Sequence, residues 1–272
     1  MSPSSPTDPP SSSPATDSAS ATSTDPTPST STDPASSTSA SPPPGAADCR
    51  FRDRAVYLGD ADTLVLADLH VGRAEAASVD APLGEATDRI ERLEALLAAF
   101  EPAQVVFAGD VLDRFDRLSE RSRRTVASLR TACLDAGADP VALAGNHDTR
   151  LADCWPDSVA EERTLSDGTV VCHGHVEPDA RGRRYLIGHD HPAIAIEGVR
   201  RPCFCFGEGC YRGGDLLVLP AFTRLAAGVE INDRRAADFQ SPLVASLEAL
   251  RPVVVDGEAL WFPPLGAFRR LL

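Results

Sequence analysis

Histidine is the residue whose placement most constrains this chain. All six histidines follow stretches that we predict to be buried strands, and each lies beside or within a short run of Gly, Asp or His; they are His70, His147, His173, His175, His189 and His191. Histidines used only for packing would also fall in helices or in the N-terminal region. In open α/β sheets the carboxyl ends of strands form the functional edge. The pattern therefore predicts a histidine-rich site at such an edge.

Residues 54–144 alternate between strand and helix patterns. Short apolar runs predict strands at 54–58, 63–67, 104–108 and 141–144. Amphipathic helices are predicted at 85–100, which Pro102 ends, and at 119–136, which Gly137 ends. This order predicts a sheet covered by helices.

The second half of the sequence is dominated by strand patterns. We predict strands at 169–172, 185–187, 193–196, 202–206 and 216–219, and one helix at 241–250. These strands would form a second sheet that packs against the first. The expected fold class is therefore α/β, a two-sheet β-sandwich flanked by helices.

Oxygen and imidazole side chains follow five of the predicted strands. Asp68 and His70 are two residues apart, so they point the same way in an extended chain. The other strand ends supply Asp110, then Asn146 with His147, then His173, and then His189 with His191. Such a mixed set suits Mn, Fe, Zn or similar ions, and the absence of cysteine from it disfavours a thiolate zinc site.

Five ordered motifs carry a resemblance to a known family. They are Asp68-x-His70, Gly109-Asp110-x-x-Asp113, Gly145-Asn146-His147-Asp148, His173-Gly174-His175 and Gly188-His189-Asp190-His191. Together they resemble the motif set of the calcineurin-like metallophosphoesterases. The flanking residues 67–73, 187–192 and 219–222 are similar to the DNA-ligase-associated, or ICC-like, branch of that family. The resemblance implies the calcineurin-like phosphoesterase fold over residues 49–272.

The resemblance also implies a two-metal phosphoesterase and a role for each motif residue. Asp110 would bridge two divalent ions, and the remaining ligands would be Asp68, His70 and His191 for the first ion and Asn146, His173 and His189 for the second. A hydroxide bound to these metals would attack phosphorus. His147 would stabilise or protonate the leaving oxygen, and Asp113 would orient His147. Mn is the expected metal, with Fe, Zn, Ni or Mg as alternatives, and no organic cofactor is expected.

Some residues of the motifs have a second interpretation. Asp113 could be a turn residue, and His175 is as readily a solvated neighbour as a group that contacts substrate. Arg73 and Arg114 could bind phosphate. However, the chain contains no lysine, so an arginine at a plain surface position is at least as reasonable. The arginines at 121–124 fall on a predicted helix and indicate a solvated face.

The seven cysteines do not indicate a disulfide framework, because their number is odd and no secretion signal is visible. Cys203, Cys205 and Cys210 cluster, which makes a structural zinc conceivable. No fourth cysteine or nearby histidine completes the ligand set, so we favour buried small hydrophobic residues.

Residues 1–48 consist almost entirely of Ser, Pro, Thr, Ala and Asp, which predicts a disordered tail. This segment lacks the basic start and apolar run of a signal peptide, and no later stretch is long and apolar enough to cross a bilayer. We therefore expect a cytoplasmic protein without membrane contact.

The charge and the motif spacing bear on the substrate. The net charge of −14 argues against broad electrostatic wrapping of nucleic acid, although a metal site could still cut it. No insertion between the motifs is long enough for a DNA-clamping domain, which favours a compact phosphodiesterase over a processive nuclease. The expected substrate is a phosphate ester, with nucleotide or nucleic-acid diesters first. The alternatives are a phosphomonoesterase and an inactive metal-binding scaffold. A DNA-repair setting rests on the family resemblance alone.

Overall fold

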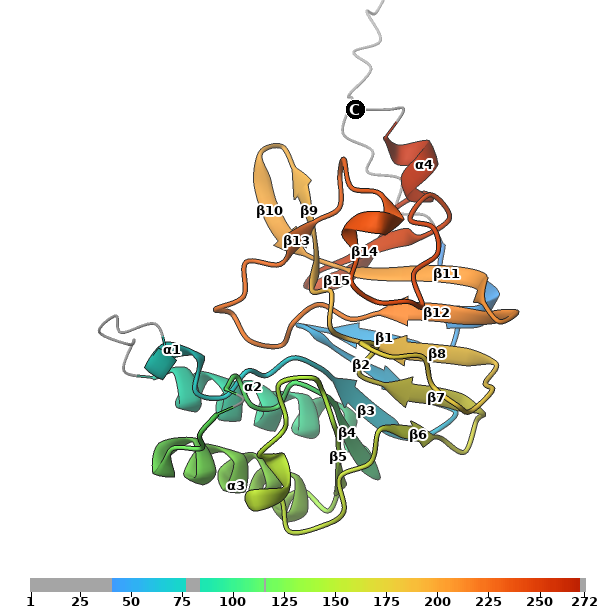
Figure 1. Ribbon diagram of the computed structural model, residues 1–272. Coiled ribbons are helices and arrows are strands. Elements are labelled where there is room, and N and C mark those ends of the chain that lie inside the picture. The colour runs from blue at the N-terminus through green and yellow to red at the C-terminus, as the bar shows by residue number, and fades with distance from the viewer. Residues whose placement is uncertain (1–40, 77–83, 115, 270–272) are drawn as a thin grey trace, which may run out of the picture. The chain divides into compact units, whose positions relative to one another are not determined.

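The computed structural model describes residues 41–76, 84–114 and 116–269 (Figure 1). Of the tail predicted over residues 1–48, residues 1–40 lie outside the described residues. Within them, runs of Val, Leu, Ala and Phe between polar turns form the strands of two large sheets. A third, three-stranded sheet stands beside them.

The first sheet has five strands in sequential order, and β3, β4 and β5 run parallel. Its strands are β1 (Cys49–Arg52), β2 (Ala55–Leu58), β3 (Thr63–Leu66), β4 (Gln104–Ala108) and β5 (Asp139–Leu143). Alternate residues of β4 face opposite sides. Val105 and Phe107 pack with residues of the helices α2 (Glu85–Phe100) and α3 (Glu120–Asp135), while Val106 and Ala108 pack with the second sheet. Burial on both faces explains why the strand is a continuous apolar run.

The second sheet has seven strands in the order β15-β14-β11-β12-β8-β7-β6, with β7, β8 and β12 parallel. They are β6 (Glu162–Thr164), β7 (Thr169–Cys172), β8 (Arg184–Ile187), β11 (Phe204–Tyr211), β12 (Gly214–Val218), β14 (Arg251–Asp256) and β15 (Glu258–Trp261). The third sheet has the order β10-β9-β13, formed by β9 (Pro192–Ile196), β10 (Val199–Pro202) and β13 (Val229–Glu230). The short helical segments are η1 (Pro44–Ala46), α1 (Arg73–Ala76), η2 (Leu151–Asp153), η3 (Ala236–Asp238) and α4 (Leu265–Phe268).

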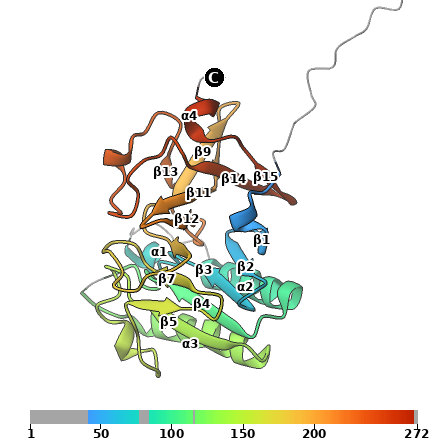
Figure 2. The same cartoon turned by 90° about the vertical axis from the view of Figure 1, so that its right-hand side faces the viewer.

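The layers confirm the expected fold class. Figures 1 and 2 show α2 and α3 on the outer face of the first sheet, with the second sheet on its other face. The far side of the second sheet is covered by irregular chain rather than by long helices. Leu243, Leu247 and Leu250 pack there with Leu265 of α4.

The helix predicted at 241–250 is wrong, because this segment consists of turns and irregular chain. Its apolar residues at 243, 244, 247 and 250 have helical spacing, but they extend from irregular chain and bury their side chains against the second sheet. The backbone N–H groups of Gln240 and Ser241 donate to the carboxylate of Asp190, at 2.7 and 3.2 Å, rather than starting a helix. The strand predicted at 202–206 is also two elements, since β10 ends at Pro202 and β11 begins at Phe204.

The folded chain begins before the expected boundary at residue 49. Ala46 in η1 is 1% exposed and packs between the two large sheets. The Asp48 carboxylate receives two hydrogen bonds from the fully buried Arg184, both of 2.8 Å. Composition alone could not show this, because the partner of Asp48 lies far along the sequence.

Two further sequence expectations concern membranes and cysteines. Among the helices of residues 41–76, 84–114 and 116–269, none has both the length and the apolar character needed to cross a membrane. Cys203 and Cys205 are buried, as we expected, whereas Cys210 is only half-buried. The metal-ligand clusters of the described residues include no cysteine.

Candidate metal centre

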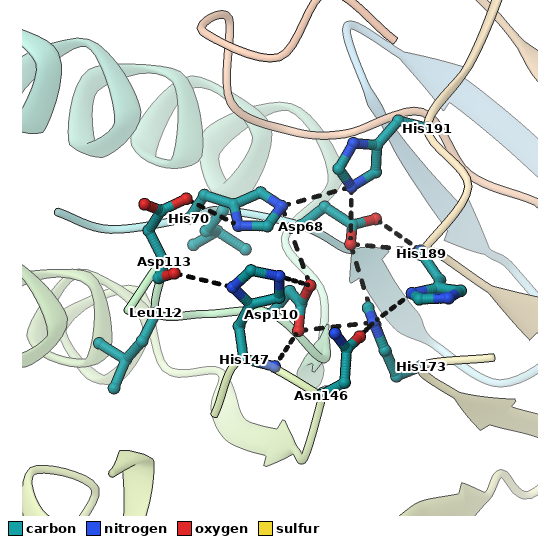
Figure 3. Close-up of polar contacts among 12 residues, drawn as sticks. Asp68, His70, Asp110, Leu112, Asp113, Asn146, His147, His173, His189 and His191 are labelled. Atoms are coloured by element: carbon teal, nitrogen blue, oxygen red, sulfur yellow. Dashed lines mark hydrogen bonds and ion pairs between the residues drawn. The ribbon is translucent and has the colours of Figure 1, made fainter. Parts of the chain in front are cut away.

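The loops after five strands bring the predicted ligands to one edge of the two sheets (Figure 3). Asp68 and His70 follow β3, Asp110 follows β4, and Asn146 with His147 follows β5. The second sheet contributes His173 after β7, and His189 with His191 after β8. Because β3, β4 and β5 are parallel, as are β7 and β8, their carboxyl ends meet at the same edges.

Three groups of side chains place potential ligand atoms within 4.8 Å of one another. Two of them share no residue, and the third, formed by His70, Asp110 and His147, shares one residue with each of these two. The first group is Asp68, His70 and His191, in which the Nε2 atom of His191 lies 3.0 Å from Oδ1 of Asp68. The second group is Asp110, His173 and His189. Asn146 adjoins it, with its Oδ1 atom 3.1 Å from Nε2 of His173.

Asp110 belongs to the second group and also faces the first. Its Oδ2 atom is 3.9 Å from Nε2 of His70, and its Oδ1 atom is 3.5 Å from Nε2 of His173. Burial, together with the neighbouring Asp68 carboxylate, raises the pKa of Asp110 to about 8. A carboxylate in this position needs positive charge close by in order to stay ionised.

The donor set fits divalent metals. The Nε2 atoms of His70 and His191 lie 3.3 Å apart, and Nε2 of His173 lies 3.1 Å from Nδ1 of His189. Burial lowers the pKa of His173 to about 3 and that of His189 to about 4, so both rings are neutral at neutral pH. Two ring nitrogens this close can share one proton between them. If neither nitrogen carries a proton, both can instead bind one metal cation. Neutral imidazoles and carboxylates are ligands that Mn, Fe and Zn accept.

Hydrogen bonds on the far side of the rings set which nitrogen faces the centre. Nδ1 of His173 donates to the carbonyl oxygen of Ala108 at 3.2 Å, which leaves Nε2 as the inward acceptor. Nδ1 of His70 lies 3.3 Å from Oδ1 of Asp113. Nδ1 of His147 lies 2.7 Å from the backbone carbonyl oxygen of Asp113. The bond that the structure shows between Asp113 and His147 thus runs through the carbonyl, whereas the Asp113 carboxylate faces His70 and Arg73.

The backbone at the centre is strained. Five of the ligand candidates have positive φ angles; they are Asp68 (57°), His70 (48°), Asp110 (48°), His189 (70°) and His191 (46°). This left-handed conformation costs about 1–2 kcal/mol for a residue other than glycine. Strain of this kind persists where the surroundings fix it, and it concentrates at functional sites.

Two of the motif glycines leave room for ligand side chains. A Cβ atom on Gly145 would lie 2.1 Å from Oδ1 of Asp110, and one on Gly188 would lie 2.4 Å from Oδ2 of Asp68. Both contacts are far inside van der Waals distance. The glycines are therefore needed because the backbone approaches the carboxylates so closely.

Three residues that hold the ligand loops were not predicted from the sequence. Asp148 accepts from the backbone N–H groups of Val111, Leu112 and Gly145, and so ties the loops after β4 and β5 together. Asp190 ties the histidine loop after β8 to residues 240–241. The buried Arg89 of α2 donates to the carbonyl oxygens of Leu69 and His70, at 2.9 and 3.2 Å. The sequence shows Asp148 and Asp190 inside motifs, but nothing in it indicates their backbone partners.

Three other residues from the sequence analysis lie around the centre without joining its ligand groups. The ring of His175 lies 5.2 Å from that of His173. Arg73 forms an ion pair with Asp113 at 3.2 Å. Arg114 pairs with Asp116 and lines a separate cavity beside the first turn of α3.

The family assignment follows from a comparison of the whole sequence. The family model described as "Calcineurin-like phosphoesterase" matches residues 62–207. The chain belongs to the calcineurin-like phosphoesterase family. It is a metal-dependent phosphoesterase, and its Asp and His clusters are compatible with the metal site of such an enzyme.

Two solved structures are similar to the chain. The nuclease MPE of Pseudomonas putida is 25% identical, with a TM-score of 0.57, and the alignment covers 77% of this chain and 92% of that one. The phosphoesterase Yfce of E. coli is 15% identical with a TM-score of 0.38, over 71% of this chain and 87% of that one. No curated protein gives a significant match. The assignment to the ICC-like branch stays a prediction.

Proposed function

We propose that this phosphoesterase is a two-metal phosphodiesterase that acts on nucleotides or nucleic acid. The first ion would bind to Asp68, His70 and His191, the second to Asn146, His173 and His189, and Asp110 would bind both. The position of Asp110 carries the proposal, because its two carboxylate oxygens face different ligand groups at 3.9 and 3.5 Å. Mn is the proposed metal.

Divalent ions at such a site supply Lewis acidity and make a bound water a strong nucleophile. The protein supplies orientation and a proton donor. His147 is placed for the second task, since its Nε2 atom lies 3.9 Å from Oδ2 of Asp110 and its side chain is 27% exposed. The carbonyl of Asp113 keeps a proton on Nδ1 of His147. A second proton on Nε2 can then pass to the leaving oxygen as the ester bond breaks.

The preference for diesters is supported by the similarity to a nuclease. The alignment with nuclease MPE covers 92% of that chain. A DNA-repair setting and a cytoplasmic location remain predictions from the sequence.

The test is hydrolysis of bis-p-nitrophenyl phosphate, a diester, beside p-nitrophenyl phosphate, a monoester. We expect activity on the diester to vanish after metal removal by a chelator and to return with Mn, with Fe, Zn, Ni and Mg compared in parallel. Undiminished hydrolysis by thoroughly demetallated protein would contradict the metal mechanism. A strong preference for the monoester would instead identify a phosphomonoesterase.

A further inference from the structure

A cavity of about 240 Å³ adjoins the first ligand group, and its charged lining is basic. His191 lines both the cavity and the metal centre, since its Nε2 atom lies 3.0 Å from Oδ1 of Asp68. Three arginines line the cavity, and we call it the arginine pocket: Arg54, Arg200 and Arg224. The other described residues of its lining are Pro, Ala and Gly, and none of the lining residues is acidic.

This composition stands out in an acidic protein. The chain has 40 acidic and 26 basic residues, yet the charged side chains that line this cavity are all arginines. The cavity on the other side of the centre, beside His173, has the opposite character. Its volume is about 300 Å³, and its charged lining residues are Glu161, Glu162, Glu177 and Asp179. The two sides of the metal centre therefore differ in charge.

The three arginines keep capacity to bind an anion. Arg54 is half-buried and donates to the carbonyl oxygens of Ala221 and Thr223, and within the described residues it forms no ion pair. Burial lowers the pKa of Arg54 to about 10, as expected for a cation that lacks an anionic partner. Arg200 pairs with Glu230 and Arg224 with Asp88, at 2.8 and 2.7 Å. These pairs are exposed and therefore weak, and each guanidinium has five N–H donors.

We infer that the arginine pocket binds a second phosphate group of the substrate, next to the scissile phosphate on the His191 side. Arginine binds phosphate through paired hydrogen bonds, and His191 connects the pocket to the reacting position. The acidic cavity beside His173 repels a phosphate on the opposite side. The inference rests on the proposed phosphodiesterase function and narrows its substrate class to diesters that carry a neighbouring phosphate, as in an oligonucleotide.

The test compares two chromogenic diesters that differ by one phosphate. They are thymidine 5′-(p-nitrophenyl phosphate) and the same compound with a 3′-phosphate. We expect the Mn-loaded protein to prefer the second compound at least tenfold in kcat/KM, the scale of one good ionic contact. Arg200→Gln and Arg224→Gln should each reduce that preference about tenfold, mainly through KM.

Arg201→Gln is the matched control. Arg201 neighbours Arg200 on β10, is similarly exposed, pairs with Asp256 and lies outside the pocket. Its substitution should leave the preference unchanged. Thermal melting of each variant checks that the fold is intact.

The outcomes separate this inference from the proposed function. The phosphate-binding role of the pocket would be overturned if wild type hydrolysed both compounds equally well. It would also be overturned if the preference remained in both Arg200→Gln and Arg224→Gln. Neither result would contradict the phosphodiesterase function. Hydrolysis of neither compound would overturn the proposed function. The pocket would then be tested by calorimetry, in which thymidine 3′,5′-bisphosphate should bind at least tenfold more tightly than thymidine 5′-phosphate to wild type but not to Arg200→Gln. Equal binding of the two nucleotides to wild type would overturn the pocket.

Discussion

At the scale of single residues, His147 and Asp110 show how neighbours at one centre can differ in task. Nε2 of His147 is 3.9 Å from Oδ2 of Asp110, so the two side chains are neighbours in the candidate metal centre. Asp110 is buried and faces histidines of both ligand groups, whereas His147 is partly exposed and takes its orientation from a backbone carbonyl. Asp110 thus fits a metal bridge, and His147 fits a group that acts on the substrate.

Substitution should separate the two roles. His147→Ala should keep both metals and lower turnover about a hundredfold or more, the scale of a lost general acid or charge stabiliser. Asp110→Asn removes the negative charge shared by two cations, so metal occupancy itself should fall. The measurement is metal stoichiometry on the purified variants beside their rates. Metal loss in His147→Ala equal to that in Asp110→Asn would make His147 a ligand, and full activity would remove it from the mechanism.

How far the centre could be predicted depends on where each residue finds its partner. His70 follows β3 and His173 follows β7, and parallel strands bring their ends together within each sheet, so the sequence places each histidine at the carboxyl edge of its own sheet. Asp113 was expected to orient His147, and the bond that the structure shows between them uses the backbone carbonyl of Asp113. Every residue has a backbone carbonyl, so the residue type does not indicate which carbonyl accepts a hydrogen bond. Arg89 was missed for a related reason, because its partners are carbonyl oxygens on a distant loop.

At the scale of elements, helix α2 is a support for the ligand loop as well as a cover for the first sheet. Arg89 in its first turns is 2% exposed. Besides the carbonyls of Leu69 and His70, it bonds to Oγ1 of Thr223 at 3.1 Å and pairs with Glu85. It therefore connects α2, the loop after β3 and the segment after β12. The predicted bounds of α2 are confirmed. The apolar pattern that predicts this helix does not indicate that Arg89 is buried and bonds to the ligand loop.

Arg89→Met should weaken the centre without touching a ligand. Methionine keeps much of the length but donates no hydrogen bonds, so the carbonyls beside His70 lose their partners. We expect metal affinity to fall about 10- to 100-fold, the usual effect of losing a group that orients a ligand. Arg124→Met, on the exposed face of α3, is the control and should bind metal like wild type. Equal metal affinity of the two variants, measured by titration, would show that Arg89 does not support the centre.

At the scale of the whole chain, the N-terminal boundary of the folded unit decides what can be removed. Contacts between residues define a compact unit over Ser39–Leu272. We predict that deleting residues 1–40 leaves turnover and thermal stability nearly unchanged, since their composition offers little apolar surface to bury. Deleting residues 1–48 should lower stability sharply, because Ala46 and Asp48 are removed with them. Thermal melts and rates of both truncations test this, and a large loss on deleting 1–40 would contradict the boundary.

The pairing of Asp48 with Arg184 also predicts a pH dependence of stability. Burial raises the pKa of Asp48, but hydrogen bonds and charge from Arg184 outweigh it and leave that pKa below its ordinary value of 3.8. A carboxyl with a lowered pKa stabilises the fold fully above its unfolded pKa, and this contribution is lost as pH falls through the folded value. Asp48→Asn should therefore cost about 3 kcal/mol at pH 7, since Arg184 stays buried with one partner fewer. The difference in the free energy of unfolding between wild type and variant should narrow below pH 4.

Urea unfolding across this pH range measures that difference, with Asp60→Asn as an exposed control that should follow wild type. A gap that is constant with pH would show that the charge of Asp48 does not stabilise the fold.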